Sequence, residues 1–511
     1  MSDTATEKRR GAFSSRAVFI MAAIGSAVGL GNIWRFPYVA YEGGGGAFVI
    51  PYIVALLVAG LPFLLMDYAL GHRFRGSAPL AFARLRRWAE GIGWWQVAIC
   101  VAIAVYYAAV IAWSVRYTGF SLSKAWGDDP ETFLMEDFLQ RSPGVSFDIV
   151  PGVLVPLALV WLVTIAIMAL GVQRGVGRTA AIFIPVLLLA FTALVVQALL
   201  LPGAATGLDA LFTPNWAALT EPAVWGSALG QIFFSLSVGF GIMITYSSYV
   251  GRKNDMTGSG LVVGLSNSGF ELLAGIGVFA ALGFLAQAND VAVTEVVASG
   301  IGLAFVVFPT IISEAPAGSL LGVLFFGSLV LAGLTSLVSI LEVVISAVRD
   351  KFELTRVRAT LLVTVPAAVV SLAFFSTSSG LSVLDIVDHF VNQYGILLVA
   401  VVSTLAVAWG ARALPTLSAH LNKHGSLRLG RWWHVLVGIV IPVALTYVLV
   451  QQLLLDLREP YEGYPTWMLA VFGWGVAIVA LVFGLIAGRT RWRAGTEVDG
   501  YDPDRVPEEA A

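Results

Sequence analysis

The chain has 511 residues, of which 58% are hydrophobic and 12% are charged, and its formal net charge is −2 at pH 7. A soluble core could not hide so much apolar surface, so this composition excludes a soluble globular protein and indicates a polytopic membrane protein. The single cysteine, Cys100, excludes an internal disulfide, and the five histidines show no metal-ligand spacing. We therefore expect no enzyme. We also expect no nucleic-acid partner, although the near-zero net charge itself says nothing about nucleic acid.

Long apolar runs recur along the whole chain, and each is long enough to cross a lipid bilayer, which takes about 20 residues. We predict an all-α fold with twelve transmembrane helices. The predicted spans are 16–40, 46–71, 92–122, 150–170, 178–200, 223–250, 258–286, 319–347, 358–375, 383–409, 433–455 and 466–488.

Lys and Arg gather in every second loop of this pattern, whereas the alternate loops, such as 128–137, carry acidic residues. By the positive-inside rule, both termini lie in the cytoplasm. The sequence has no Asn-x-Ser/Thr glycosylation site, which favours the plasma membrane of a prokaryote. The tail after about residue 494 is acidic and contains proline, so we predict that it is disordered.

Two of the apolar spans are interrupted by glycine in the same way. The first span contains Val28-Gly29-Leu30-Gly31, and the sixth contains Val238-Gly239-Phe240-Gly241. Each glycine costs a helix about 1 kcal/mol relative to alanine, so paired glycines at matching points predict local unwinding around a polar cavity. This pattern is typical of a secondary transporter built from an inverted repeat.

We therefore predict inverted five-helix repeats with unwound first and sixth helices. The predicted segments are a cytoplasmic N-terminal tail at 1–15, a first repeat at 16–200, a second repeat at 201–410 with an extracellular cap at about 288–318, spans eleven and twelve at 411–490, and a cytoplasmic C-terminal tail at 491–511.

Few ionisable residues lie inside the predicted spans, and each is costly there unless it has a partner or a proton. They are Arg35, Asp67, Glu271, Glu342 and Asp388. For Asp67 and Glu342, a purely structural pairing is an equal alternative to a functional role.

The stretches 25–38 and 43–52 resemble the signature of the neurotransmitter:sodium symporter family. Further matches follow in the family's order at 106–107, 231–237, 245–250 and 332–336. The set covers most of the chain and is specific as a whole, although no single motif is. The resemblance implies a sodium-coupled symporter that imports a neutral, hydrophobic amino acid by alternating access.

The resemblance also implies two sodium sites built from neutral oxygens, which suit a hard cation that must be released again. Sodium 1 would be held by Ala27, Asn32, Ser235 and Asn267, together with the carboxylate of the substrate. Sodium 2 would lie between the first and eighth spans, held by Gly25, Val28, Ala332, Thr335 and Ser336. Each of these Ser, Thr or Asn side chains could instead form a hydrogen bond between helices. For Asn267 taken alone we would favour that alternative, whereas the whole set of motifs favours sodium.

The substrate implied by the resemblance is a zwitterion bound between the two broken helices. Its carboxylate would meet amide groups of the first half-helix and the Tyr107 hydroxyl. The implied substrate residues are Ala27, Leu30, Gly31, Ile103, Tyr107, Phe234, Ser235, Ser237, Phe240, Ser336 and Ile340. Monoamine carriers of the family have aspartate in the place of Gly29, so glycine favours an amino acid, while a betaine or a γ-amino acid is left open.

Glu271 follows Asn267 by four residues, so on a helix it faces the same side, beside sodium 1. In chloride-dependent relatives a serine occupies this place. The resemblance therefore implies that the Glu271 carboxylate substitutes for chloride, that transport needs no chloride, and that protonated Glu271 could return with the empty carrier, giving proton antiport.

The resemblance implies an outer gate made of Arg35 and Asp388 and an inner gate made of Arg10 and Asp350, with Phe13 nearby. A sodium-dependent amino acid sensor that binds without transport is the alternative, but charge pairs at both gates favour a transporter. The sequence does not tell which amino acid is carried, how many sodium ions move, or whether the protein forms a homodimer.

Overall fold

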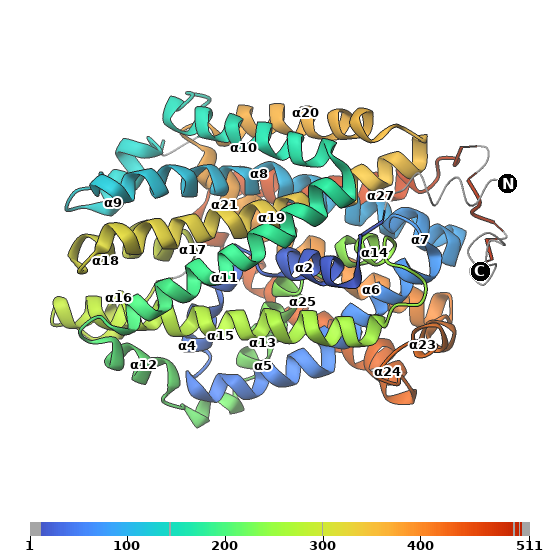
Figure 1. Cartoon of the computed structure of the whole chain (residues 1–511), viewed down its shortest axis with the longest axis horizontal. Coiled ribbons are helices and arrows are strands. Elements are labelled where there is room, and N and C mark those ends of the chain that lie inside the picture. Colours follow the sequence, from blue (N-terminus) through green and yellow to red (C-terminus); the bar gives the residue numbers. More distant parts are fainter. Residues whose placement is uncertain (1–11, 143–144, 299, 494–495, 500, 503–511) are drawn as a thin grey trace.

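The computed structural model describes residues 12–142, 145–298, 300–493, 496–499 and 501–502. The fold is an all-helical bundle whose helices run roughly along the long axis of the molecule (Figure 1). No β-strand occurs within these ranges, which contain only two isolated β-bridges, between Gly45 and Pro214 and between Ile149 and Thr377.

Ten of the described helical segments are long and apolar enough to cross a membrane, and a helix pair bent by 56° adds an eleventh span. The bent pair is α2 (Arg16–Ala27) with α3 (Leu30–Trp34) and α4 (Phe36–Glu42). The remaining predicted span is divided between α13 (Pro222–Ser235) and α14 (Ile242–Ser247), which are too short to cross alone. The prediction of a polytopic all-α fold with broken first and sixth spans is therefore confirmed.

The ten unbroken spans follow the predicted order with small shifts of their ends. They are η1–α6 (Gly46–Phe74), η3–α8 (Arg87–Ser123), α10 (Pro151–Ala169), η5–α11 (Val172–Leu199), α15 (Met256–Ala288), α19 (Gly318–Phe352), α20 (Arg356–Phe375), α21–η9 (Gly380–Gly410), α24–η11 (Arg431–Gly463) and α26–α27 (Thr466–Ala487).

Short helices connect these spans at the two ends of the bundle. At the end shown on the right of Figure 1 lie α7 (Ala78–Leu85) and α23 (Leu414–Asn422). The opposite end carries α9 (Pro130–Thr132), α12 (Ala204–Phe212), α16 (Val293–Val296), α17 (Gly300–Gly302) and α18 (Phe308–Glu314). The loop predicted as a cap at 288–318 thus contains helices, and Phe305 in it contacts Trp34 and Trp113.

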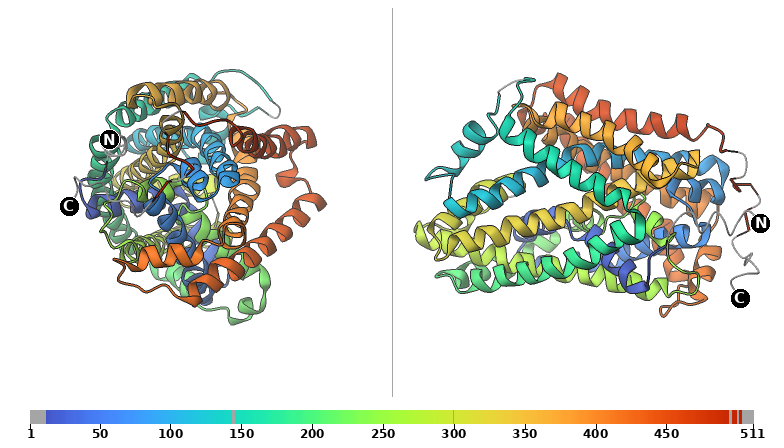
Figure 2. Two further views of the ribbon diagram at one scale, coloured as in Figure 1. Left: turned by 90° about the vertical axis from the view of Figure 1, so that its right-hand side faces the viewer. Right: turned by 45° about the horizontal axis from the view of Figure 1, so that its top comes forward.

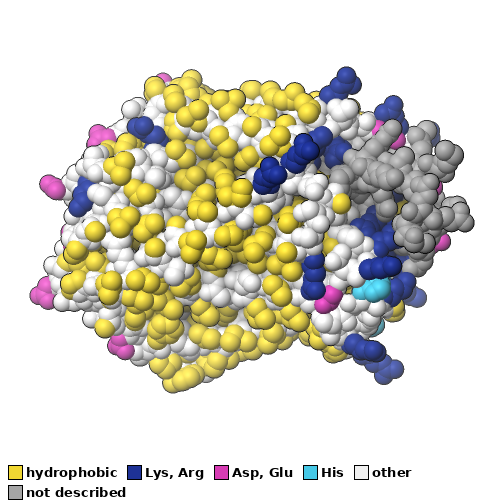
Figure 3. Space-filling model, in the orientation of Figure 1, with side chains coloured by type: hydrophobic (Ala, Val, Ile, Leu, Met, Phe, Trp, Pro, Cys, Tyr) yellow, Lys and Arg dark blue, Asp and Glu magenta, His cyan; other side chains and the backbone are white. Residues whose placement is uncertain are grey.

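The lateral surface of the bundle is apolar, as expected of a surface that faces lipid. Leu189, Leu200 and Val479 are 73%, 80% and 67% exposed there. Figure 3 shows this hydrophobic surface between one end rich in Lys and Arg and another that carries Asp and Glu. Viewed from the basic end, helices from both halves of the chain surround a central region (Figure 2). Inside, α8 (Glu90–Ser123) and α19 form the most extensive helix pair.

The prediction of a disordered tail after about residue 494 is wrong for residues 496–499, while 494–495, 500 and 503–511 lie outside the described residues. Val498 is buried against Leu80 and Ala83 of α7, so the segment 496–499 is packed rather than disordered.

Candidate functional site

The break in the first span lies between Ala27 and Leu30. Gly29 has an extended backbone, with φ −122° and ψ −168°. Its N–H donates to the Asn32 Oδ1 atom at 2.9 Å, and the next N–H, that of Leu30, points at the Tyr107 hydroxyl at 3.4 Å. The unwinding therefore turns backbone amides toward side chains, Asn32 on α3 and Tyr107 on α8, instead of toward carbonyls of their own helix.

The break in the sixth span covers residues 236–241, between α13 and α14. Gly239 and Gly241 have φ of +88° and +87°, a conformation that glycine adopts without strain. Side chains from neighbouring helices hold the freed backbone groups of Gly239. Its N–H donates to Asp67 at 3.3 Å, and its carbonyl accepts from Gln96 at 2.9 Å. Asp67 therefore has a contact with the unwound segment.

Gln96 and Cys100 are residues at the sixth-span break that sequence reasoning missed. The Cys100 thiol donates to the Phe240 carbonyl at 3.2 Å. A positional pattern could have found both, because Gln96, Cys100, Ile103 and Tyr107 follow one another at helical spacing and share one face of α8.

A cavity of about 60 Å³ lies between the two breaks, more than a single water needs. Every predicted substrate residue except Ser235 lines it. Those residues are Ala27, Leu30, Gly31, Ile103, Tyr107, Phe234, Ser237, Phe240, Ser336 and Ile340. The lining also includes Asn392 and Ile396, which the sequence did not indicate. Its walls combine apolar side chains with a few hydroxyl and amide groups, as small-molecule sites do.

The three predicted side chains of sodium 1 meet in one buried chain of hydrogen bonds. Asn32 on α3 donates to the Asn267 Oδ1 atom on α15 at 2.9 Å, and Asn267 in turn donates to the Ser235 hydroxyl on α13. All three are at most 1% exposed. Neutral oxygens from three helices thus converge beside both breaks, which is the donor set a sodium ion needs.

The predicted residues of sodium 2 lie where α2 packs against α19. A Cβ atom on Gly25 would lie 3.4 Å from the Thr335 Cβ atom, so the two helices approach closely at this glycine. Thr335 donates to the Ala332 carbonyl at 2.9 Å, and Ser336 donates to the Ser26 carbonyl at 3.4 Å. Val28 forms the C-terminal cap of α2 beside them. Hydroxyl and carbonyl oxygens of both helices are thus close together, which also fits sodium.

Glu271 is fully buried one helical turn after Asn267. Its carboxylate accepts hydrogen bonds from Tyr52 and, at 2.5 Å, from Gln231, and it also interacts with the Ser235 hydroxyl. Arg35 acts on it electrostatically, but no ion pair reaches Glu271 within the part of the chain that the structure describes. The carboxylate is thus connected to the sodium 1 residues through Ser235.

The outer gate residues lie around Phe234. The Arg35 guanidinium lies 4.8 Å from the centre of the Phe234 ring, while Asp388 accepts from Tyr106 at 2.6 Å and from Asn392 at 2.8 Å. Arg35 and Asp388 attract each other without forming a direct ion pair. A second, wider pocket of about 630 Å³ is lined by Arg35 and shares Phe234, Asn392 and Ile396 with the central cavity. Phe234 therefore stands between the two.

The inner gate is described in part. Arg10 lies outside the described residues, whereas Asp350 at the end of α19 accepts from the Ser77 N–H at 2.9 Å. Phe13 packs edge-on against Tyr246 of α14, at 5.5 Å between ring centres. Glu342, buried nearby, forms a two-point ion pair with Arg356, at 2.7 and 2.9 Å.

Comparison with known proteins gives consistent matches over nearly the whole chain. The family model described as the sodium:neurotransmitter symporter family matches residues 10–140 and 123–493. A protein named as an uncharacterised sodium-dependent transporter of Methanocaldococcus jannaschii is 41% identical over 480 residues, covering 93% of this chain and 97% of the relative. The sodium- and chloride-dependent neutral and basic amino acid transporter B(0+) of Mus musculus is 28% identical over 93% of this chain and 84% of its own length. The sodium-dependent dopamine transporter of Bos taurus is 29% identical over 92% of this chain and 73% of its own length.

Proposed function

The chain belongs to the sodium:neurotransmitter symporter family, and we propose that it imports a neutral, hydrophobic amino acid together with sodium, independently of chloride. The observation that carries the proposal is the cavity between the two broken spans, which the Asn32–Asn267–Ser235 chain borders and Tyr107 and Phe234 line. We place both termini in the cytoplasm of a prokaryotic cell, because the basic end of the bundle would then face inward.

Two features of the cavity favour a zwitterion over a monoamine. The Leu30 N–H and the Tyr107 hydroxyl at the start of the second half-helix supply donors for a carboxylate. A Cβ atom at Gly29 would lie 3.2 Å from the hydroxyls of both Tyr107 and Ser336, so a larger residue would place its side chain in the cavity. With glycine, that volume remains for the carboxylate of the substrate.

The side chain of the amino acid would meet Ile103, Phe240 and Ile340, which are apolar. These walls suit an aliphatic or aromatic group. They do not rank one such side chain over another, because one methylene in an apolar pocket changes binding by only about 1–3 kcal/mol.

Sodium would be held by the residues of sodium 1 and sodium 2, and it would supply positive charge for the substrate carboxylate. To bind it, Asn267 would turn its Oδ1 atom from Asn32 to the ion. The Glu271 carboxylate, linked to this site through Ser235, would supply the negative charge that chloride provides in chloride-dependent relatives. A proton on Glu271 would neutralise that charge in the empty carrier, so protons would leave as sodium enters.

Equilibrium binding of radiolabelled neutral amino acids to the purified protein, with sodium titrated against potassium, tests this proposal. Asn267→Ala removes a predicted sodium oxygen and should raise the sodium concentration needed for half-maximal binding by about tenfold or more. Asn422→Ala, at the end of α23, is the matched control because, among the described residues, the Asn422 side chain bonds only to the Leu429 backbone. Sodium-independent binding, or equal behaviour of the two variants, would contradict the proposal.

A further inference from the structure

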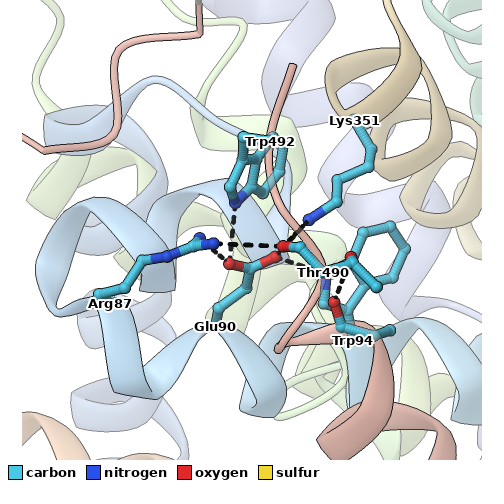
Figure 4. Close-up of polar contacts among 7 residues, drawn as sticks. Arg87, Glu90, Trp94, Lys351, Thr490 and Trp492 are labelled. Carbon is cyan, nitrogen blue, oxygen red and sulfur yellow. Dashed lines mark hydrogen bonds and ion pairs between the residues drawn. The ribbon is translucent and has the colours of Figure 1, made fainter. Parts of the chain in front are cut away.

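A buried carboxylate outside the transport site lies at the beginning of α8. Glu90 is 0% exposed, and its Oε1 atom lies 2.8 Å from the Lys351 ammonium at the end of α19. The other carboxylate oxygen, Oε2, accepts hydrogen bonds from Arg87 and, at 2.8 Å, from the Trp492 indole N–H (Figure 4). Lys351 also donates to the Thr490 carbonyl at 3.0 Å and lies 4.2 Å from the Trp492 ring. This cluster therefore joins two spans to the chain that follows the last span.

Close packing brings that following chain to Glu90. A Cβ atom on Gly484 of α27 would lie 2.8 Å from the Gly91 carbonyl oxygen, and one on Gly488 would lie 2.7 Å from the Gly91 nitrogen. Glycine at these positions lets α27 end directly beside the start of α8. The chain therefore leaves the membrane next to Glu90.

We name the described residues 489–493, 496–499 and 501–502 the C-terminal strap. Beyond its anchor at Glu90, the strap lies along α7. Val498 packs on Leu80 and Ala83, the Glu497 carbonyl accepts from Arg84 at 2.9 Å, and the Arg84 guanidinium lies 3.8 Å from the centre of the Tyr501 ring. The strap thus has two parts, an anchor on α8 and α19 and a clamp on α7.

The clamp holds the turn that links the second span to α7. Arg84 donates to the carbonyls of Phe74 and Arg75 in this turn, at 2.6 and 3.1 Å, while it contacts the strap. The Ser77 N–H in the same turn donates to Asp350, the predicted inner gate residue, which directly precedes Lys351. The strap therefore crosses the boundary between the end of α19 and the turn before α7, at the basic end of the bundle.

We propose that the C-terminal strap, anchored at Glu90, clamps α7 and keeps the cytoplasmic pathway closed, so that its release from α7 is a step of inward opening. The proposal rests on the proposed transport cycle, in which the cytoplasmic side must open. The anchor remains in place because separating the strap would take the Trp492 N–H from the buried Glu90 carboxylate and the Thr490 carbonyl from the buried Lys351 ammonium. Among the described residues, the clamp is made by the packing of Val498, the Glu497 hydrogen bond and the Tyr501 cation–π contact, and it contains no buried charge like that of the anchor, so it is the weaker part.

The test is the reaction rate of a single cysteine in the inner pathway with a maleimide, measured on purified protein. Cys100→Ser removes the native thiol and keeps a donor toward Phe240, and Ser248→Cys places a thiol in α14's C-terminal turn, where Ser248 is 7% exposed. The clamp is weakened by Val498→Asp or by truncation after Arg493. The controls are Asp499→Asn, which alters an exposed strap residue, and truncation after Asp502.

We expect Val498→Asp and the truncation after Arg493 to raise the labelling rate at position 248 by about fivefold, the change in an equilibrium that one lost hydrogen bond produces. Both controls should leave the rate unchanged. Rates within twofold of the parent in both clamp variants would overturn the proposal. A parallel increase for Ser328→Cys, in the buried interior of α19, would also overturn it, because it would mean general loosening. The measurement needs neither sodium nor a substrate, so its failure is distinguishable from a failure of the proposed function.

Discussion

Replacing Glu271 with glutamine removes one buried negative charge while keeping the size of the side chain. The Ser235 hydroxyl interacts with the carboxylate and is also a proposed sodium ligand. The Ser235 hydroxyl would thus join the two by one hydrogen bond and one sodium–oxygen contact, which places the Glu271 carboxylate about 5 Å from the ion. At an effective dielectric constant of about 20, the carboxylate then stabilises the ion by about 3 kcal/mol, which corresponds to about a hundredfold in sodium affinity.

The assay is sodium-dependent binding of a radiolabelled amino acid to purified protein in sodium gluconate. Glu271→Gln should need about a hundredfold more sodium for half-maximal binding. Glu42→Gln, an exposed carboxylate at the end of α4, should match the wild type. Glu271→Ser, which leaves room for an anion, should regain affinity when chloride replaces gluconate. A sodium dependence of Glu271→Gln within twofold of the wild type would refute the role assigned to this carboxylate.

Two further predictions concern single residues. Gly29→Asp should abolish amino acid binding. The carboxylates of the new side chain and of the substrate would lie about 4 Å apart, and at an effective dielectric constant of about 20 they repel by about 4 kcal/mol. The control is Gly119→Asp, at an open surface position, and equal binding by both variants would contradict the placement of the substrate carboxylate. Asp255 caps α15, and although burial alone would raise its pKa, hydrogen bonds from the backbone N–H groups of Gly258 and Ser426 lower it. Its folded pKa is thus below the unfolded value of about 3.9, so its stabilisation is present above that pH and is lost as the pH falls through the folded pKa. Asp255→Ala should cost about 1 kcal/mol in thermal unfolding at pH 7 and less than that near pH 3, and an equal cost at both pH values would count against the cap.

Much of the fold could be predicted because it depends on local features of the sequence. The lengths of the apolar runs predict the spans, and the glycines of 28–31 and 238–241 mark the breaks. Gly239 and Gly241 have positive φ, a conformation that glycine adopts without strain. The meeting of Asn32, Asn267 and Ser235 could not be derived in this way. It joins helices that are distant in sequence, so only the family resemblance indicated it.

Features that depend on packing between distant segments were missed. The hydrogen bond from Trp492 to Glu90 joins residues 402 positions apart. Composition alone indicated a disordered tail after about residue 494, whereas Val498 packs on Leu80 and Ala83. The Gln96 contact with the sixth-span break depends on how α8 packs beside it. Likewise, the resemblance implied an outer gate of Arg35 and Asp388, but it did not indicate that Tyr106 and Asn392 donate to the carboxylate or that the Phe234 ring lies against the guanidinium. The inverted repeat and the homodimer stay predictions.

The most direct test of sodium-coupled import is uptake of radiolabelled neutral amino acids into proteoliposomes. An inward sodium gradient is compared with an equal potassium gradient, and chloride is replaced throughout by gluconate. We expect accumulation above the external concentration with sodium alone, accompanied by alkalinisation of the lumen as protons leave. Sodium-dependent binding without accumulation would contradict the account and would identify a sensor, and uptake that requires chloride would contradict the role of Glu271.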